Sequence, residues 1–180
     1  MTGAMRSFPW KRAWRWAVEA LLSVGLAAAI VLFVYQPVRV EGTSMMPALV
    51  DDERLFVNKF LYRLGVGAVE RGDMVVFQSP LEPSKSYIKR VIGVPGDTVE
   101  IRAGVVWLNG HRLDESYVPD DYRDSASLAP VRVPTGHYFV MGDHRSASND
   151  SRQWGPVPRQ SLYGKAVFAY WPLERMGTLR

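Results

Sequence analysis

The sequence predicts an all-β domain, built mainly from antiparallel sheets, behind one N-terminal transmembrane α-helix. An uncharged apolar run at 20–35 predicts the helix, and short β-rich runs separated by turn formers predict the domain. The chain has 180 residues, which is room for one anchor and one domain of about 140 residues. We therefore expect a basic tail (1–15), a membrane anchor (16–36) and a β domain (37–180).

The predicted anchor lies between aromatic residues that suit the two faces of a bilayer. About twenty helical residues cover a hydrocarbon core of roughly 30 Å. Trp10, Trp14 and Trp16 precede the apolar run and Tyr35 follows it, and both residue types are enriched at membrane interfaces. Pro37 is expected to end the helix.

The distribution of charge orients this anchor. The chain carries 22 Lys and Arg against 18 Asp and Glu, a net charge of +4. Four of the basic residues precede the apolar run: Arg6, Lys11, Arg12 and Arg15. The positive-inside rule therefore places the N-terminus in the cytoplasm and residues 37–180 outside it. The alternative is a cleaved signal peptide, whose apolar region is normally about 7–15 residues long and followed by an Ala-x-Ala site.

Composition excludes several classes of function. Most of the excess positive charge lies in the tail, whereas a nucleic-acid-binding protein carries it on the folded domain, so we exclude nucleic acid as a partner. The absence of cysteine excludes disulfides, a thiol nucleophile and thiolate metal ligands. His111, His137 and His144 lie far apart and outside any metal-binding motif. No metal or other cofactor is expected.

The β domain is predicted from short runs bounded by turn formers. These runs are PVRVEG (37–42), RLFVNKF (54–60), DMVVFQS (73–79), YIKRVIGV (87–94), DTVEIRAG (97–104), VVWLNGHRL (105–113), HYFVMGD (137–143) and KAVFAYW (165–171). Asn109–Gly110 predicts a two-residue hairpin turn. The polar stretch 116–130, with Asp120, Asp121 and Asp124, is expected to be an exposed loop, or alternatively to bind a cation.

Three segments carry candidate chemistry, each with a plainer alternative. GTSMMP (42–47) presents Ser44 between a glycine turn and a bulky apolar pair, although most such serines are ordinary turn residues. YIKRVIG (87–93) places Lys89 among apolar neighbours, where burial lowers the pKa of a lysine toward that of a general base. The alternative is a snorkelling or ion-paired lysine. MGDHRSASNDSR (141–152) is either a solvated loop or one held by ion pairs.

Taken together, these segments resemble a known family. VEGTSMMPAL, RGDMVVF, YIKRVIGVPGDTVEI and MGDHRSASNDSRQWG look like the four soluble boxes of bacterial type I signal peptidases, in the family's order and behind an N-terminal anchor. The resemblance covers about residues 36–170. It implies a signal-peptidase-like β fold and a membrane-bound serine endopeptidase that removes signal peptides from exported preproteins, cutting after small residues at Ala-x-Ala-type sites. Its implied partners are those preproteins, the lipid bilayer and the nearby export translocon, at the cytoplasmic (inner) membrane.

The resemblance also implies roles for individual residues. Ser44 matches the nucleophile in S-M-x-P, and Lys89 matches its general base in Y-I-K-R. Ser148, the third residue after Arg145 in GDxRxxS, matches the serine that orients the lysine. Hydrolysis would then pass through an acyl-enzyme, with the Ser44 N–H as the first donor to the oxyanion. Some members carry a second donor serine where this chain has Gly42, so the second donor from this region is left open.

Two further groups of residues follow from the resemblance. The residues expected to support the catalytic loop are Asp143, Arg145, Asp150 and Arg152. The substrate is expected to bind as an added strand, with shallow pockets lined by Val38, Val40, Met45, Leu49, Tyr87 and Ile88, for which ordinary β core is the alternative. The box position usually held by Asn is His144, which we expect to be tolerated.

Three other functions remain as alternatives. A self-cleaving repressor-type protease shares Ser–Lys chemistry, but it carries a DNA-binding domain rather than an anchor. A dedicated peptidase that processes one precursor has the same residues as a general one. A non-catalytic, membrane-tethered β module that binds extended peptides has no need for Ser44, Lys89 and Ser148 together.

Overall fold

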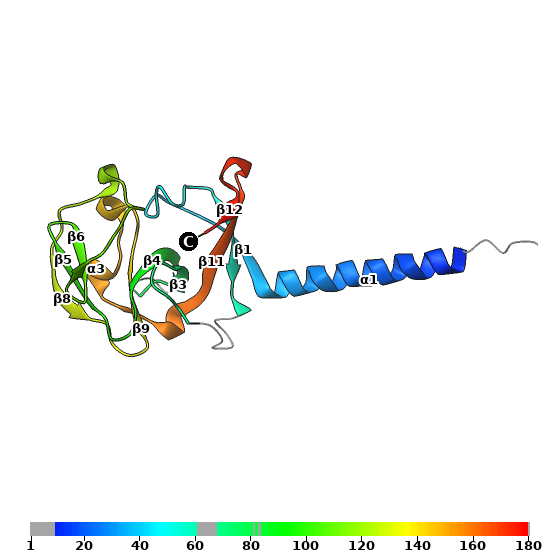
Figure 1. Cartoon of the computed structure of the whole chain (residues 1–180), viewed down its shortest axis with the longest axis horizontal. Coiled ribbons are helices and arrows are strands. Elements are labelled where there is room, and N and C mark those ends of the chain that lie inside the picture. Colours follow the sequence, from blue (N-terminus) through cyan, green and yellow to red (C-terminus); the bar gives the residue numbers. More distant parts are fainter. Residues whose placement is uncertain (1–9, 61–67, 81, 83, 180) are drawn as a thin grey trace, which may run out of the picture. The chain divides into compact units, whose positions relative to one another are not determined.

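The computed structural model describes residues 10–60, 68–80, 82 and 84–179 (Figure 1). The chain divides into two compact units, Met1–Val34 and Tyr35–Arg180. The second unit begins close to residue 37, where the sequence predicts the start of the β domain. The division into tail, anchor and extracytoplasmic domain stays a prediction.

The described part of the first unit is helix α1, Trp10–Val34. It overlaps the predicted anchor but starts earlier. The helix ends at Val34 rather than at Pro37, because Tyr35 begins strand β1 and Pro37 lies inside it. A proline is tolerated there because β1 is an edge strand. In the part of the chain that the structure describes, no helix combines the length and the apolar character needed to cross a membrane.

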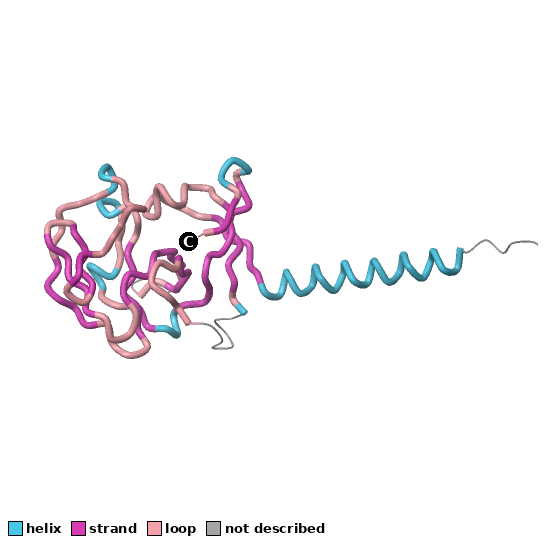
Figure 2. Tube along the Cα trace, viewed as in Figure 1, coloured by secondary structure: helices cyan, strands magenta, loops and turns pink. Residues whose placement is uncertain are grey.

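The second unit is made of strands joined by loops and short helices (Figure 2). The strands are β1 (Tyr35–Arg39), β2 (Arg54–Asn58), β3 (Met74–Gln78), β4 (Ser86–Gly93), β5 (Thr98–Arg102), β6 (Val105–Leu108), β7 (His111–Arg112), β8 (Leu128–Arg132), β9 (His137–Met141), β10 (Val157–Pro158), β11 (Leu162–Trp171) and β12 (Gly177–Thr178). The short helices are η1 (Asp120–Tyr122), η2 (Arg145–Ala147), α3 (Ser151–Trp154), η3 (Arg159–Ser161) and η4 (Leu173–Arg175).

The described strands form two sheets in which every pairing is antiparallel. The larger sheet has the order β1-β2-β11-β3-β4-β9-β10, with β12 beside β11, and the smaller has the order β7-β6-β5-β8. Figure 1 shows β5, β6 and β8 gathered at one side of the unit and β1 with β11 at the other. The predicted antiparallel β fold is confirmed.

The hairpin prediction holds, whereas strands β8, β10 and β12 lie outside the runs that predict strands. Asn109 and Gly110 connect β6 to β7 with φ of 53° and 82°, as a type I′ hairpin turn requires. Strand β8 was not predicted, since its first residues fall in the stretch 116–130 that reads as a loop. Pro130 interrupts its β pattern, and the sheet accommodates this proline because β8 is a terminal strand.

The core explains why charged residues of β4 are buried. Val91 belongs to one buried cluster and Ile92 to a second, while Ile88 packs against a third. Both faces of β4 are therefore covered by apolar side chains. Lys89 and Arg90 lie between them and are 3% and 4% exposed.

Candidate active site

Ser44 lies in the loop between β1 and β2, and its apolar neighbours fix its position. Met45 and Leu49 are 1% and 0% exposed and belong to the core. Two backbone hydrogen bonds close the turn, from Met46 N to Thr43 O at 3.0 Å and from Leu49 N to Met45 O at 2.9 Å. Because Met45 and Leu49 point into the core, Ser44 is held at the surface of the core, where it is half-buried.

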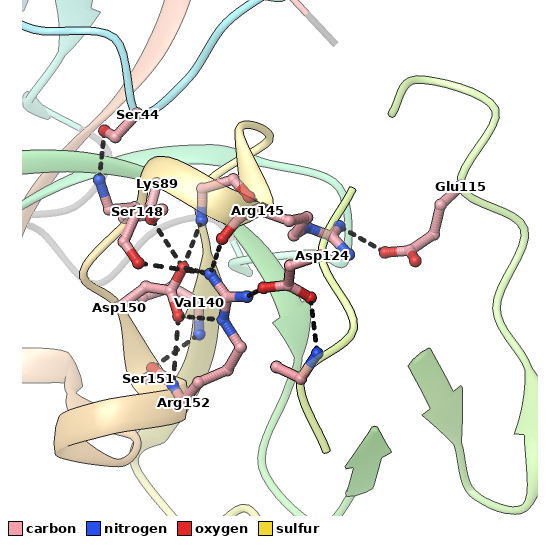
Figure 3. Close-up of polar contacts among 12 residues, drawn as sticks. Ser44, Lys89, Glu115, Asp124, Val140, Arg145, Ser148, Asp150, Ser151 and Arg152 are labelled. Atoms are coloured by element: carbon pink, nitrogen blue, oxygen red, sulfur yellow. Dashed lines mark hydrogen bonds and ion pairs between the residues drawn. The ribbon is translucent and has the colours of Figure 1, made fainter. Parts of the chain in front are cut away.

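Lys89 contacts the Ser44 hydroxyl directly, as Figure 3 shows. Its Nζ lies 2.5 Å from Ser44 Oγ. Burial lowers the pKa of Lys89 to about 8, although the carboxylates of Asp150 and Asp143 act in the opposite direction. Arg152 adds a smaller lowering. A lysine with this pKa is neutral often enough near neutral pH to accept a proton from a hydroxyl.

Asp150 accepts most of the hydrogen bonds in the loop next to Ser44 and Lys89 (Figure 3). Its fully buried carboxylate accepts hydrogen bonds from Ser148 Oγ at 2.7 Å and from Gly142 N at 3.0 Å. It also receives Arg152 Nε and Nη2, both at 2.8 Å. The Ser148 hydroxyl thus donates to Asp150, and among the described contacts no hydrogen bond joins it to Lys89.

Gly142 lets the loop after β9 approach Ser44 closely. A Cβ at this position would lie 2.3 Å from Ser148 Oγ and 2.4 Å from Ser44 O, far inside van der Waals contact. The next residues run along the loop that carries Ser44, and His144 N donates to Ser44 O at 3.1 Å. A side chain at 142 would therefore push apart the loops that carry Ser44 and Ser148.

Asp143 pairs with an arginine from the neighbouring strand β4. Arg90 Nε and Nη2 donate to its two carboxylate oxygens at 2.9 and 2.7 Å, and both residues are buried. The ring of Tyr117 covers the guanidinium, with its centroid 4.4 Å away. This pair holds the start of the loop after β9 against β4, the strand that carries Lys89.

Two supporting carboxylates escaped the sequence prediction. Arg145 Nη2 pairs with Glu115 at 2.5 Å, with both side chains almost completely buried. Arg152 pairs with Asp124, which the sequence placed in an exposed loop. Asp120 and Asp121 are exposed as expected, but Asp124 is only partly exposed.

A signal for these carboxylates did exist in the sequence. The three arginines of the YIKR and GDHR–NDSR segments outnumber the two aspartates beside them. Buried arginines require carboxylate partners, so at least one more acid had to come from elsewhere. Which acid this is depends on contacts between distant segments.

A hollow of about 150 Å³ opens beside Ser44 and Lys89. Its walls are Val38, Arg39, Val40, Glu41, Leu55, Val76, Ser86, Tyr87, Ile88 and Tyr163. Of the residues predicted to line the substrate pockets, Val38, Val40, Tyr87 and Ile88 border the hollow. Val40 also belongs to the buried core, and Met45 and Leu49 lie in that core without bordering the hollow.

The backbone around Ser44 offers one free donor. No acceptor for the Ser44 N–H is found among the described residues. The N–H of Gly42, by contrast, donates to Asp51 Oδ1 at 2.8 Å. The Gly42 N–H is therefore occupied in this structure, and an oxyanion donor from this region stays a prediction.

Comparison with known proteins gives consistent matches. A family model described as "Signal peptidase, peptidase S26" matches residues 13–171. A protein named signal peptidase I from Bacillus amyloliquefaciens is 39% identical over 173 residues, which cover 91% of this chain and 88% of the relative. Another with that name from Leptolyngbya laminosa is 41% identical over 168 residues, covering 88% and 79%. The crystal structure of a signal peptidase I from Enterococcus faecalis V583 aligns with a TM-score of 0.49 and 34% identity, over 55% of this chain and 97% of that one.

Proposed function

The chain belongs to the signal peptidase family, peptidase S26, and we propose that it removes signal peptides from exported preproteins with Ser44 as nucleophile and Lys89 as general base. The observation that carries this proposal is the 2.5 Å contact between the buried Lys89 Nζ and Ser44 Oγ. A serine hydroxyl attacks an amide only when a base takes its proton. Burial supplies that base by lowering the pKa of Lys89 to about 8.

The proposed reaction proceeds in two halves. Neutral Lys89 takes the Ser44 proton as Oγ attacks the scissile carbonyl carbon, and the Ser44 N–H stabilises the oxyanion. The Lys89 ammonium then protonates the leaving amine, which departs and leaves an acyl-enzyme. Lys89 next deprotonates a water molecule, which attacks the ester and regenerates the Ser44 hydroxyl as the acid product leaves.

Ser148 is proposed to orient Lys89 between these steps. Because its hydroxyl proton is donated to Asp150, its oxygen keeps lone pairs with which to accept a bond from the lysine. Asp150 in turn is fixed by Arg152. The Lys89 ammonium formed in each half-reaction would therefore donate a hydrogen bond to the Ser148 oxygen, which its own bond to Asp150 holds in place.

Substrate is proposed to bind in extended form along the free edge of β1, the terminal strand of the larger sheet. The apolar walls of the hollow, Val38, Val40 and Ile88, suit small uncharged side chains. Cleavage after Ala-x-Ala sites is the expected specificity.

We also propose that α1 attaches the chain to the cytoplasmic membrane as a single-pass anchor, with residues 35–180 on the outer side near the export translocon. The described surface of α1 exposes large apolar side chains: Leu21, Leu22, Val24, Leu26, Val31 and Phe33. Alkaline carbonate extraction of membranes tests the attachment, and protease protection tests the orientation. Release of the chain by carbonate would show that α1 does not span the bilayer.

The catalytic proposal is tested with a detergent-solubilised preprotein carrying an Ala-x-Ala site. Wild type should cut after the second alanine, whereas Ser44→Ala and Lys89→Ala should lose at least about three orders of magnitude in rate. Ser146→Ala and Lys85→Ala are matched controls, because both residues are exposed, and should cut normally. An inert wild type, or cutting by the Ser44 and Lys89 variants, would favour a non-catalytic peptide-binding module.

A further inference from the structure

One side chain outside the proposed Ser44–Lys89–Ser148 set holds the peptide unit of the nucleophile. The half-buried His144 makes two contacts with the Ser44 loop. Its backbone N donates to Ser44 O at 3.1 Å, and its ring Nδ1 lies 3.2 Å from Thr43 O. Two successive carbonyls of the nucleophile loop are thus bound by the same residue.

The contact with Thr43 fixes the tautomer of the His144 ring. A carbonyl oxygen only accepts hydrogen bonds, so Nδ1 must carry the proton and donate it. The ring also contacts Tyr122, whose centroid lies 4.8 Å away at an interplanar angle of 78°. An edge-to-face contact of this kind restrains the plane in which Nδ1–H points.

The Thr43 carbonyl and the Ser44 N–H belong to one planar peptide unit. In a trans peptide the two groups point in opposite directions, so fixing the carbonyl fixes the direction of the N–H. Thr43 O accepts from Met46 N at 3.0 Å as well as from His144. Donation to a peptide oxygen also polarises the unit and makes its N–H a stronger donor. Among the described residues this N–H has no acceptor of its own.

We infer that His144 is a positioning residue for the oxyanion-binding N–H of Ser44, acting through the Thr43 carbonyl. The inference rests on the proposed function and adds to it a residue that touches neither the scissile bond nor Lys89. It assigns His144 to stabilisation of the transition state rather than to binding of the substrate. Loss of the ring donor should therefore lower kcat and leave KM unchanged.

Three substitutions separate the Nδ1 donor from the bulk of the side chain. His144→Asn places an amide N–H near the position of Nδ1, whereas His144→Gln places it near Nε2. His144→Leu keeps apolar volume without any donor. The backbone bond from residue 144 to Ser44 O persists in all three variants, so only the side-chain contact changes.

The matched control is His137→Leu. The ring of His137 makes the same kind of contact, from Nδ1 to Thr135 O at 3.1 Å, in the turn that precedes β9. The His137→Leu variant should therefore keep the kcat and KM of wild type.

The experiment measures kcat and KM on an Ala-x-Ala peptide and the Ki of a peptide aldehyde of the same sequence. The aldehyde adds to Ser44 Oγ as a hemiacetal, whose oxygen occupies the oxyanion position. His144→Leu and His144→Gln should lower kcat about fivefold to tenfold, as expected for one lost hydrogen bond, and raise the aldehyde Ki by a similar factor. His144→Asn should restore both values to within about twofold of wild type.

The outcomes distinguish this inference from the proposed function. If wild type cuts and His144→Gln equals His144→Asn, the position of the donor is irrelevant and the inference is wrong. If His144→Leu raises KM with kcat unchanged, the ring serves substrate binding instead, which also overturns it. If wild type cuts nothing and no aldehyde adduct forms on Ser44, the proposed function fails and the inference fails with it.

Discussion

At the scale of single residues, the burial of Lys89 has opposite effects on the stability of the fold and on the proposed chemistry. It is 3% exposed, and its ammonium is disfavoured because burial removes it from water. The same burial lowers its pKa to about 8. The burial that suits Lys89 to the proposed role of base therefore destabilises the folded chain whenever the lysine is charged.

The first prediction concerns the pH dependence of cleavage. In the proposed mechanism only neutral Lys89 takes the Ser44 proton, so kcat/KM should rise with pH to a plateau, with a midpoint near the pKa of about 8. Steady-state cleavage of a soluble peptide between pH 6 and pH 10, a span chosen to bracket that value, measures this midpoint. A flat profile across this range would rule out Lys89 as the base.

The second prediction is that Lys89→Met abolishes cleavage but stabilises the fold at pH 7. A lysine pKa lowered from 10.5 to about 8 corresponds to a destabilisation of about 3 kcal/mol while the lysine is protonated in both states. Between those two pKa values the unfolded chain binds more protons, so the stability of wild type rises with pH. Denaturant unfolding should show the advantage of the variant to be full below pH 8 and mostly gone near pH 10.5. An advantage that does not change with pH would point to packing rather than charge.

At the scale of elements, the segment between β7 and β8 supports the catalytic loop from outside it. Asp124 pairs with Arg152, which fixes Asp150 beneath Ser148. The same segment supplies Glu115 to Arg145. The backbone of Asp124 also lies against Gly104, where any Cβ would meet Asp124 O at 1.9 Å. The turn between β5 and β6 thus packs directly against Asp124, the residue that pairs with Arg152.

The third prediction is that Asp124→Asn slows cleavage severalfold with little change in KM. The neutral amide weakens the pairing of Arg152 and leaves a mostly buried charge less compensated, and breaking a buried pair costs roughly 3–5 kcal/mol at most. Asp120→Asn is the control, because the Asp120 side chain is fully exposed in the same segment. Equal kinetics for the two variants would contradict a supporting role for Asp124.

The sequence predicts local features and misses those that depend on distant partners. The hairpin at Asn109–Gly110 and the burial of Lys89 follow from the residues next to them. The pairing of Asp124 with Arg152 does not, because an isolated aspartate in a polar stretch is usually solvated. Likewise Met45 stands beside the nucleophile in sequence, yet the turn directs its side chain into the core.

At the scale of the whole molecule, residues 35–180 carry a complete core and the proposed site. The described strands begin at Tyr35, directly after α1, and the three buried clusters draw all of their members from the second unit. Both residues of the Ser44–Lys89 contact belong to the second unit.

The fourth prediction is that a chain starting at Tyr35 folds and cleaves a short soluble peptide with unchanged kcat. Its midpoint of thermal unfolding should lie within about 5 °C of the full chain, a shift that corresponds to roughly 1 kcal/mol. Cleavage of a preprotein in lipid vesicles should fall, because the enzyme and its substrate no longer share a surface. Loss of peptide cleavage in the shortened chain would show that α1 contributes to the site itself.

The hollow and the charge network meet only at β4. Val38 and Val40 form one wall of the hollow from the β1 side, whereas the ion pairs that support the lysine come from the loops after β7 and β9. On the proposed function, substitutions at Val38 would change the fit of the substrate and leave the ion pairs around Lys89 in place, whereas Val40 packs in the same core cluster as Met45 and Leu49, next to Ser44. The cleavage-site preference of such an enzyme could therefore change during evolution while its proposed catalytic mechanism stays the same.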